Sequence, residues 1–586
     1  MLVLCAALLA CGGGGGGSSP APASPATPAS TPQLSASPTS LALGNQPLGS
    51  TSAGYAVQIT NTGPTTTGAL GVSVTGSNFS VFSTNCANLA ANTSCTVTFK
   101  FTAQSLGTYA AVATIGDGTL STSVNLSATA VAAAVSCSAL SAVASVTPAT
   151  TLSQAGLAAF VPKIHVRNHK VLPMVTAGQP SNTPGAYLPA DIRQAYGLPA
   201  LPASWSGLTP AQLASYGAGQ TIYIVDAGSS PANVLADLNS FSTAGGLPAC
   251  TSVAAQVPMP VPGAACNFAL AYSNSSGQLT ATPPPQASGW ALEIALDVEW
   301  AHAIAPLAQL VLIESPGPDF TLYYAVALAN AMAGSQGGVV SMSWGATESS
   351  GFNGASSVLN SFFSTAGMTY LAAAGDNGEA VVIPAAHPKV LAIGGTSLVY
   401  YASTGSRTEV VWSNPGTYGT GGGISGYTPI PAYQQHTVLI PGEPTTSCGS
   451  NFRAVADLSM NADPSTGVVV YENGGRYTGV GGTSLSTPTF AGIAAVSNAQ
   501  RALAGNGAIG DIHAFLYSNI YGNAGVYAGA LNDITQGNNA TSSGCLLYNG
   551  TPDVTGATCA AAIGYDIPTG LGTPIFSGLT AALAAK

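Results

Sequence analysis

Apolar and polar residues alternate along the first part of the chain, between Leu34 and Val131. Runs such as YAVQITNTG, CTVTFKFTA and STSVNLSATA have the period of two that is typical of strands with one buried face, and Gly, Asn, Ser and Thr turns separate them. The pattern predicts a small antiparallel β-sandwich over residues 34–131. This region holds one acidic residue, Asp117, and no histidine, so we do not expect catalysis there.

A different pattern runs over residues 160–586. Continuous apolar runs such as TIYIVDAG, AQLVLIES, GGVVSMSWG and MTYLAAAGD alternate with helical stretches such as WALEIALDVEWAHAI and FTLYYAVALANAMAG. This alternation predicts an α/β domain with a mostly parallel sheet and helices on both faces. The Ala-, Ser- and Val-rich residues 132–159 between the two patterns are predicted to be a linker.

The start of the chain predicts export. Residues 1–11 are apolar and look like the end of an export signal, and residues 12–33 form a Gly/Pro/Ser/Ala linker. Leu8-Leu9-Ala10-Cys11 resembles the bacterial lipoprotein cleavage box, in which Cys11 would carry a lipid anchor; secretion without a lipid stays open. No other run is apolar for 18 residues, so no transmembrane helix is predicted. We expect a bacterial protein that is secreted or held at the cell surface.

The amino-acid composition restricts which classes of partner the protein is expected to bind. Of 586 residues only 11 are Lys or Arg and 21 are Asp or Glu, with a formal net charge of -10, so nucleic acid is not an expected partner. Few carboxylates also favour tolerance of low pH, because acidification neutralises few paired groups. We expect a monomeric chain.

Eight of the ten cysteines lie beyond the signal and suit an oxidising compartment. Three pairs are close in sequence and sit in loop-like contexts, and by elimination Cys137 would pair with Cys448, although sequence does not establish connectivity. The three close pairs are Cys86 with Cys95, Cys250 with Cys266, and Cys545 with Cys559.

Glu293, Asp297 and Glu299 concentrate three carboxylates in a chain that is only 5% charged. Glu293 and Asp297 are four residues apart, so on a helix they share one face, where one carboxylate can orient the other. A partly buried pair of like charges holds one proton to a higher pH. The alternative is an exposed acidic helix face, but the flanking residues are apolar. Glu299 lies well round the helix and is expected to be solvated or structural.

Ser484 lies in GGTSLSTPTFAGIAAV, where a loop enters a buried helix. A nucleophile there gains from the helix dipole and from nearby backbone N–H donors, whereas a serine in this place is often only a helix cap. A nucleophilic serine needs a base. None of the six histidines lies in the HGTH-type segment that subtilisin-like enzymes use; they are His165, His169, His302, His387, His436 and His513.

These motifs together resemble the sedolisins, the serine-carboxyl peptidases with a subtilisin-like fold. GTSLSTPTFAG resembles the Gly-Thr-Ser-x-x-x-Pro signature of subtilases and sedolisins, and LDVEWAHAIAP, VVSMSWG, AAAGDNG and RAVADLSMNADPSTG agree in order and spacing. The resemblance implies that Ser484 is the nucleophile, Glu293 the general base and then acid, and Asp297 the carboxylate that orients Glu293. Asp376 would fill the oxyanion hole, for which it must be protonated. The implied activity is acid-active endopeptidase cleavage of peptide bonds.

The same resemblance implies further sites. Ser343, Trp344 and Gly345 would lie along the substrate cleft, as would Gly421, Gly422 and Gly423. A Ca²⁺ ion would be held by the carboxylates of Asp533 and Asp566 and the carbonyls of Ile534, Ala562 and Gly564. Asp226, which ends a strand, would support Glu293 or be structural.

The β-sandwich region, with Asn61, Gly63, Cys86 and Cys95, resembles bacterial immunoglobulin-like modules, which implies a spacer or adhesion role. Sedolisins usually carry a long propeptide, whereas only about 30 residues separate the two patterns here. Either this enzyme folds without one, or another segment replaces it.

Two other functions remain open. One is a neutral or alkaline subtilisin-like peptidase that uses Asp226, His302 and Ser484. The other is a surface binding or adhesion protein whose peptidase domain is inactive.

Overall fold

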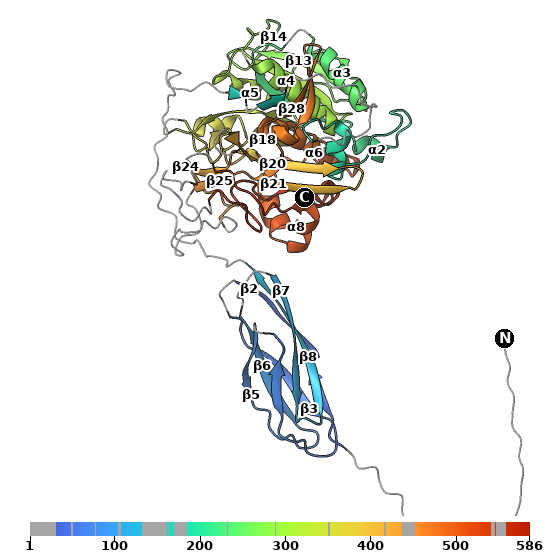
Figure 1. Ribbon diagram of the computed structural model, residues 1–586, viewed down its shortest axis with the longest axis vertical. Coiled ribbons are helices and arrows are strands. Elements are labelled where there is room, and N and C mark those ends of the chain that lie inside the picture. The colour runs from blue at the N-terminus through green and yellow to red at the C-terminus, as the bar shows by residue number, and fades with distance from the viewer. Residues whose placement is uncertain are drawn as a thin grey trace, which may run out of the picture. The chain divides into compact units, whose positions relative to one another are not determined.

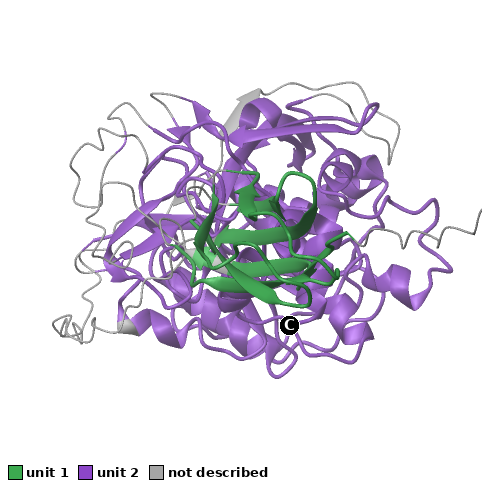
Figure 2. Ribbon diagram, turned by 90° about the horizontal axis from the view of Figure 1, so that it is seen from below, with its two compact units in different colours: residues 1–136 green, residues 137–586 purple. Residues whose placement is uncertain are grey.

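The computed structural model describes residues 31–47, 51–76, 78–102, 107–131, 161–162, 165–168, 184–230, 233–287, 289–349, 352–414, 418–435, 452–540, 545 and 558–586. The chain divides into two compact units, residues 1–136 and residues 137–586 (Figure 2). The predicted signal, the first linker up to residue 30, the second linker, Cys11, and the Cys137 and Cys448 pair lie outside the described residues.

The first unit is a sandwich of two four-stranded sheets, in the orders β1-β3-β6-β5 and β2-β8-β7-β4. Alternate residues of each strand point into one apolar core, which includes Val57, Val97, Phe99 and Ile115. The pairing is antiparallel except that β2 runs parallel to β8. The strands are β1 Leu34–Ser37, β2 Ser40–Pro47, β3 Tyr55–Asn61, β4 Gly71–Val74, β5 Phe79–Thr84, β6 Ser94–Phe101, β7 Gly107–Gly116 and β8 Ser121–Val131. The immunoglobulin-like assignment of this unit stays a prediction.

The second unit is built on a ten-stranded sheet in the order β12-β13-β15-β11-β16-β18-β20-β21, with β14 beside β13 and β26 beside β20 (Figure 1). The strands from β12 to β20 run parallel, and β21 closes one edge antiparallel. The strands are β11 Thr221–Ala227, β12 Thr251–Ser252, β13 Asn267–Ser273, β14 Leu279–Thr280, β15 Gln309–Ser315, β16 Gly338–Met342, β18 Met368–Ala373, β20 Leu391–Tyr401, β21 Ser406–Val411 and β26 Leu458–Asn461.

Smaller sheets border this one. Their strands are β9 Val161–Pro162 with β17 Trp344–Thr347 and β19 Val382–Ile383; β10 His165–Asn168 with β28 Gly475–Gly481 and β27 Val468–Glu472; β22 Ser413–Asn414 with β23 Tyr418–Gly419; β24 Gly423–Pro429 with β25 Phe452–Val455; and β29 Leu531–Asn532 with β30 Thr573–Pro574.

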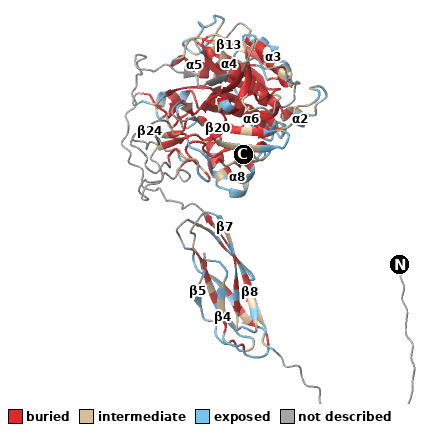
Figure 3. Ribbon diagram, viewed as in Figure 1, coloured by how far each residue is buried: buried red, intermediate tan, exposed pale blue. Residues whose placement is uncertain are grey.

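Helices pack on the sheet, and the most buried of them are α4 and α6 (Figure 3). The helices are α1 Pro189–Ala195, α2 Pro210–Ala214, α3 Val234–Gly245, α4 Trp290–Ile304, α5 Thr321–Ala333, α6 Thr483–Leu503, α7 His513–Phe515, α8 Ala524–Ala530 and α9 Phe576–Ala584, with short turns η2 Ser357–Ser361, η3 Pro464–Thr466 and η4 Leu516–Tyr521. The predicted α/β class, with a mostly parallel sheet and helices and a preceding all-β region, is confirmed.

Helices α4 and α6 approach each other closely because α6 has a glycine at the contact. A Cβ atom on Gly492 would collide with the Cβ atom of Ile304 in α4. The glycine therefore lets the helix that carries Glu293 lie directly against the helix that carries Ser484.

The three disulfides predicted from close pairs are present: Cys86–Cys95, Cys250–Cys266 and Cys545–Cys559. None of the helices that the structure describes is both long and apolar enough to cross a membrane.

Candidate active site

The candidate residues gather at the carboxyl edge of the parallel sheet. Asp226 lies near the end of β11, Glu314 near the end of β15, Ser343 directly after β16, and Asp376 three residues after β18. The carboxyl ends of parallel strands meet at one edge, and this is where open α/β sheets place their ligands. Helix α4 and the start of α6 complete the site.

Helix α4 buries its carboxyl groups. Most of its residues are buried, and both Glu293 and Asp297 are 0% exposed. The alternative of an exposed acidic helix face is therefore wrong. Burial first, and then the charges of Asp226 and Glu293, raise the pKa of Asp297 well above the usual value of a carboxyl group.

Ser343 connects Asp297 to the nucleophile segment. Its hydroxyl donates a hydrogen bond to Asp297 Oδ1 at 2.8 Å, and the same oxygen lies 3.3 Å from the carbonyl oxygen of Ser484. In return the Ser484 hydroxyl donates to the Ser343 carbonyl oxygen at 3.4 Å. A serine predicted to line the substrate cleft thus joins the carboxylate pair to Ser484 through its side chain.

The backbone around Ser484 explains this contact. Gly482 precedes α6 with a φ of 109°, which a residue with a side chain rarely adopts, so the chain turns sharply into the helix. Pro488 has no N–H group and cannot donate to the carbonyl four residues earlier. That carbonyl belongs to Ser484, and it is the one that lies against the Ser343 hydroxyl.

Asp376 contacts the residue that precedes Ser484. Its Oδ1 atom accepts hydrogen bonds from the backbone N–H of Thr483 at 2.9 Å and from the Thr483 hydroxyl at 2.7 Å, and its side chain is 2% exposed. Thr483 directly precedes Ser484, so this carboxyl group also fixes the first turn of α6.

Asp226 and Glu314 extend the group of buried carboxyls. The two residues are register partners on the parallel strands β11 and β15, and both are 0% exposed. Burial, with a contribution from the charge of Glu314, raises the pKa of Asp226 to about 8. Burial raises the pKa of Glu314 to about 7, although the N–H of Ser230 donates to it at 2.6 Å. Because Asp226 also acts on Asp297, it belongs to the carboxylate end of the site.

Glu299 is buried rather than solvated. Its Oε2 atom accepts a hydrogen bond from the backbone N–H of Tyr471 at 3.0 Å, and burial raises its pKa well above the usual value. Tyr471 belongs to β27, which forms a hairpin with the β28 strand that leads into α6. Of the two roles predicted for Glu299, the structural one agrees with this contact.

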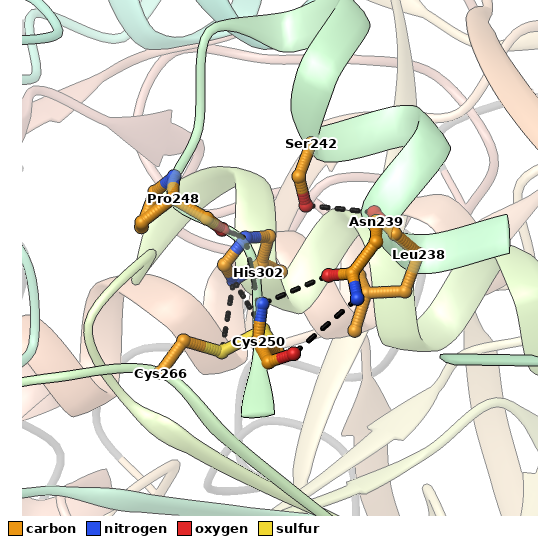
Figure 4. Close-up of a disulfide and its surroundings, with 7 residues drawn as sticks. All are labelled: Leu238, Asn239, Ser242, Pro248, Cys250, Cys266 and His302. Carbon is orange, nitrogen blue, oxygen red and sulfur yellow. Dashed lines mark hydrogen bonds between the residues drawn. A yellow bond between two sulfur atoms is a disulfide. The ribbon is translucent and has the colours of Figure 1, made fainter. Parts of the chain in front are cut away.

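His302 lies at the last turn of α4, beside a disulfide (Figure 4). Its Nε2 atom is 3.0 Å from the carbonyl oxygen of Pro248, and its Nδ1 atom is 3.7 Å and 3.6 Å from the sulfurs of Cys250 and Cys266. Burial lowers its pKa to about 4. Both ring nitrogens therefore face this cluster, and the arrangement does not support His302 as the base of Ser484.

The other residues predicted for the cleft are held by contacts within the fold. The Trp344 side chain is 0% exposed, and its Nε1 atom donates to the carbonyl oxygen of Val225 at 2.8 Å. Strand β17, which holds Trp344 and Gly345, pairs with β19 on one side and β9 on the other. The N–H of Gly421 donates to the carbonyl of Gly375, next to Asp376, and Gly422 and Gly423 continue from it into β24.

The predicted calcium ligands lie close together near the C-terminus. Asp533 Oδ2 accepts from the N–H of Gly564 at 2.9 Å, and Asp566 Oδ2 accepts from the N–H of Ala562 at 3.2 Å. Burial raises the pKa of Asp533 and raises that of Asp566 to about 7. Two partly desolvated carboxylates, with the main chain of residues 562–564 bonded to both of them, form a donor set that suits a hard cation. Ile534 follows Asp533 directly, and its side chain is buried.

Comparisons with known proteins agree with this geometry. Residues 276–508 match the Subtilase family. The chain is 32% identical to kumamolisin of Bacillus sp. (strain MN-32) over 69% of this chain and 64% of that protein. It is 32% identical to sedolisin of Pseudomonas sp. (strain 101) over 34% of this chain and 29% of that protein, and 30% identical to tripeptidyl-peptidase 1 of Canis lupus familiaris over 50% and 52%.

A solved structure of Pseudomonas sedolisin, a serine-carboxyl proteinase complexed with pseudo-iodotyrostatin, superposes with a TM-score of 0.51 and 24% identity; it covers 69% of this chain and 99% of that one. The chain spans less than two thirds of the length of each curated relative named above, 64% in the case of kumamolisin. The matched part contains the buried carboxylates of α4 and the Gly-Thr-Ser segment of α6, and over this part the comparisons support the sedolisin family.

Proposed function

We propose that the second unit is an acid-active serine-carboxyl endopeptidase that uses Ser484, Glu293 and Asp297. The observation that carries this proposal is the Ser343 hydroxyl, which joins Asp297 to the Ser484 segment. The position of His302, whose ring faces a disulfide, also supports it. The carboxylates of α4, the helix that packs against α6, are then the candidates for the base of Ser484.

In the proposed mechanism the Ser484 oxygen attacks the peptide carbonyl, and Glu293 takes the hydroxyl proton and returns it to the leaving amine. Asp376 donates a hydrogen bond to the oxyanion, and water then hydrolyses the acyl-enzyme. Asp297 Oδ1 is occupied by the Ser343 hydroxyl, so a proton on Asp297 would lie on Oδ2 and point to a second acceptor, which we assign to Glu293.

The buried carboxyls favour an acid optimum. Because the pKa of Asp297 is raised, Asp297 keeps its proton through the acid range and loses it as the pH rises, and it then no longer has a proton to donate to Glu293 as this proposal requires. Stability follows the same direction. Folding raises the pKa of Asp226 to about 8 and that of Glu314 to about 7, so the folded chain holds protons that the unfolded chain releases above about pH 4. The stability from these two groups is full below that pH and is lost as the pH rises toward their folded pKa values.

We test the proposed function by following hydrolysis of a denatured protein across roughly pH 2 to 10, together with the melting temperature at each pH. Wild-type activity is expected only on the acid side, and the melting temperature is expected to fall toward neutral pH. The matched control is Ser484→Ala, which should lose activity by about 10³-fold or more while melting as the wild type does. A neutral or alkaline optimum would contradict the carboxylate mechanism, and Ser484-independent hydrolysis would contradict the nucleophile.

A tripeptidyl-peptidase is the second candidate, because one relative bears that name at 30% identity. The two activities differ in their products. An endopeptidase converts a long peptide with a blocked N-terminus into internal fragments, whereas an enzyme that removes tripeptides requires a free N-terminus. We further propose that the protein is exported, with Cys11 as a lipid anchor, and that it acts as a monomer on polypeptides.

We also propose a structural Ca²⁺ ion held by the carboxylates of Asp533 and Asp566 and the carbonyls of Ile534, Ala562 and Gly564. Such an ion would supply no chemistry to the reaction and would cross-link the C-terminal loops.

Removal of Ca²⁺ with a chelator is expected to lower the melting temperature by about 5–10 °C, since binding stabilises only the folded chain. Calorimetry with and without added Ca²⁺ measures this shift. In Asp533→Asn the difference between the two conditions should disappear. An identical melting temperature for the wild type in both conditions, with no calcium by elemental analysis, would overturn the proposal.

A further inference from the structure

Two cysteines lie side by side at the amino ends of neighbouring strands, away from the candidate active site. Strands β12 and β13 run parallel, with Thr251 opposite Asn267. Cys250 and Cys266 directly precede these two residues. The N–H of Thr251 donates to the carbonyl oxygen of Cys266 at 3.0 Å. Because the candidate catalytic residues gather at the carboxyl ends of the strands, the two cysteines lie at the opposite edge of the sheet.

His302 brings an imidazole to the two sulfurs from the last turn of α4 (Figure 4). Its Nδ1 atom is 3.7 Å from the Cys250 sulfur and 3.6 Å from the Cys266 sulfur, and its Nε2 atom is 3.0 Å from the carbonyl oxygen of Pro248. A carbonyl oxygen only accepts hydrogen bonds, so Nε2 carries the hydrogen of the neutral ring and the lone pair of Nδ1 faces the sulfurs. A histidine that binds a metal through one nitrogen usually donates its other N–H to such a carbonyl.

Secondary structure holds these three side chains together independently of the S–S bond. The pairing of β12 with β13 places the two cysteines next to each other. Asn239 of α3 also fixes the main chain of Cys250, because its Oδ1 atom accepts the Cys250 N–H at 2.8 Å and its Nδ2 atom donates to the Cys250 carbonyl oxygen at 3.3 Å. All three side chains are buried. The group is therefore expected to stay assembled in a chain whose disulfide has not formed.

The distances within the group match those of a tetrahedral zinc site. With zinc–nitrogen bonds of about 2.0–2.1 Å and zinc–sulfur bonds of about 2.3 Å, a nitrogen ligand and a sulfur ligand lie about 3.6 Å apart. The two distances from Nδ1 of His302 to the sulfurs, 3.6 Å and 3.7 Å, agree with this value. The three ligand atoms all lie within 4.8 Å of one another. In the reduced chain only the two sulfurs have to move apart, to about 3.8 Å.

We propose that Cys250, Cys266 and His302 bind a zinc ion in the reduced chain, and that formation of the disulfide expels the ion. Two thiolates and an imidazole form a donor set that suits zinc and not calcium, and zinc accepts three protein ligands with a water in the fourth position. His302 and Glu293 lie near opposite ends of α4, so the ion would hold the last turn of the helix and supply no chemistry to Ser484. The site is thus additional to the proposed peptidase function and does not depend on it.

The exchange of zinc for a disulfide is a two-electron oxidation. Both thiols lose their protons when they bind the ion. A small-molecule disulfide such as oxidised glutathione then accepts two electrons and two protons and becomes two thiols, while the sulfurs of Cys250 and Cys266 form their bond through a mixed disulfide. The zinc ion leaves with its charge unchanged, and Nδ1 of His302 again contacts the two sulfurs of the disulfide.

The test uses the full chain, refolded without oxygen in a phosphine reductant with Zn²⁺, or with Co²⁺ as a spectroscopic probe. Elemental analysis measures bound zinc, and the visible absorption of bound Co²⁺ reports tetrahedral coordination. The reduced wild type is expected to hold zinc and to melt at a higher temperature with zinc than without it. When oxidised glutathione is added, zinc should be released in step with formation of the Cys250–Cys266 bond, which peptide mass mapping follows.

Matched variants separate this site from the other cysteines of the chain. His302→Gln should lower zinc affinity at least about tenfold, because it removes the nitrogen ligand while its amide can still donate to Pro248. The control is His387→Gln, which changes another buried histidine, one whose Nε2 atom lies 3.2 Å from Oδ1 of Asn360. It should bind zinc as the wild type does. Cys250→Ser should lose the ion as well.

Equal zinc affinity in the wild type and in His302→Gln would overturn the inference, because thiols alone would then hold the ion. A reduced wild type that folds without binding zinc, or that does not fold when zinc is present, would also overturn it; the melting transition distinguishes these two results. Zinc retained after the Cys250–Cys266 bond has formed would refute the exchange. The pH series on Ser484-dependent hydrolysis uses the oxidised chain, so the proposed function stands or fails separately.

Discussion

Replacing Glu293 with Gln is expected to lower kcat by about 10²–10⁴-fold, because an amide cannot take the proton of the Ser484 hydroxyl. The change keeps the size of the side chain and removes a charge from a site that is 0% exposed, so no uncompensated charge is left behind. The melting temperature should therefore stay the same or rise. Single-turnover kinetics at the acid optimum measure the loss.

The matched control is Glu299→Gln on the same helix. Glu299 is also buried, and its raised pKa means that a neutral amide resembles its form in acid. An amide oxygen can still accept the N–H of Tyr471. We expect kcat within about twofold of the wild type. If Glu293→Gln kept wild-type activity at every pH while His302→Gln lost it, the base would be the histidine.

The same substitution has a consequence for pH dependence. The charge of Glu293 contributes to the raised pKa of Asp297, after burial and the charge of Asp226. Without that charge the remaining activity should lose its alkaline limb at a lower pH than the wild type does. A merely structural role for Glu293 would reduce activity equally at all pH values.

The sequence predicted the fold well because burial leaves a direct signal in it. Parallel strands covered on both faces are mostly apolar without alternation, as in residues 221–227 and 309–315, and helices between them show another period. The apolar flanks of Glu293 and Asp297 likewise indicated a partly buried pair, and in the structure both residues are buried. Site residues that lie on a single buried helix could therefore be identified from the sequence pattern.

Site residues that come together only through the order of strands in the sheet could not be identified from the sequence pattern. In the sequence, Glu314 is only the end of one more strand. It lies beside Asp226 because β15 pairs with β11, although β13 comes between these two strands in the chain. The acid at the end of an otherwise apolar strand was the signal that could have identified it. Ser343 was predicted for substrate binding from the family resemblance. No period shows which way a side chain points after a strand ends, and the hydroxyl of Ser343 turns to Asp297.

Replacing Asp376 with Ala is expected to lower kcat by about 10²–10³-fold, the loss usual for one oxyanion donor. Part of that loss would come from Thr483, whose N–H and hydroxyl both donate to Asp376 Oδ1. Thr483→Val separates the two effects, because it removes the hydroxyl contact and keeps the shape and the N–H. We expect Thr483→Val to lose much less activity than Asp376→Ala.

Asp376→Asn distinguishes a donor from a merely structural carboxyl. The amide oxygen can replace Oδ1 as acceptor for Thr483, and the amide N–H₂ donates at every pH, whereas a carboxyl donates only when it is protonated. Activity of Asp376→Asn should therefore stay within about tenfold of the wild type at the acid optimum and decline less steeply as the pH rises. If Asn were as damaging as Ala, with the fold intact by melting temperature, hydrogen-bond donation by Asp376 to the oxyanion would be refuted, and the carboxyl would have to act through its position at the start of α6.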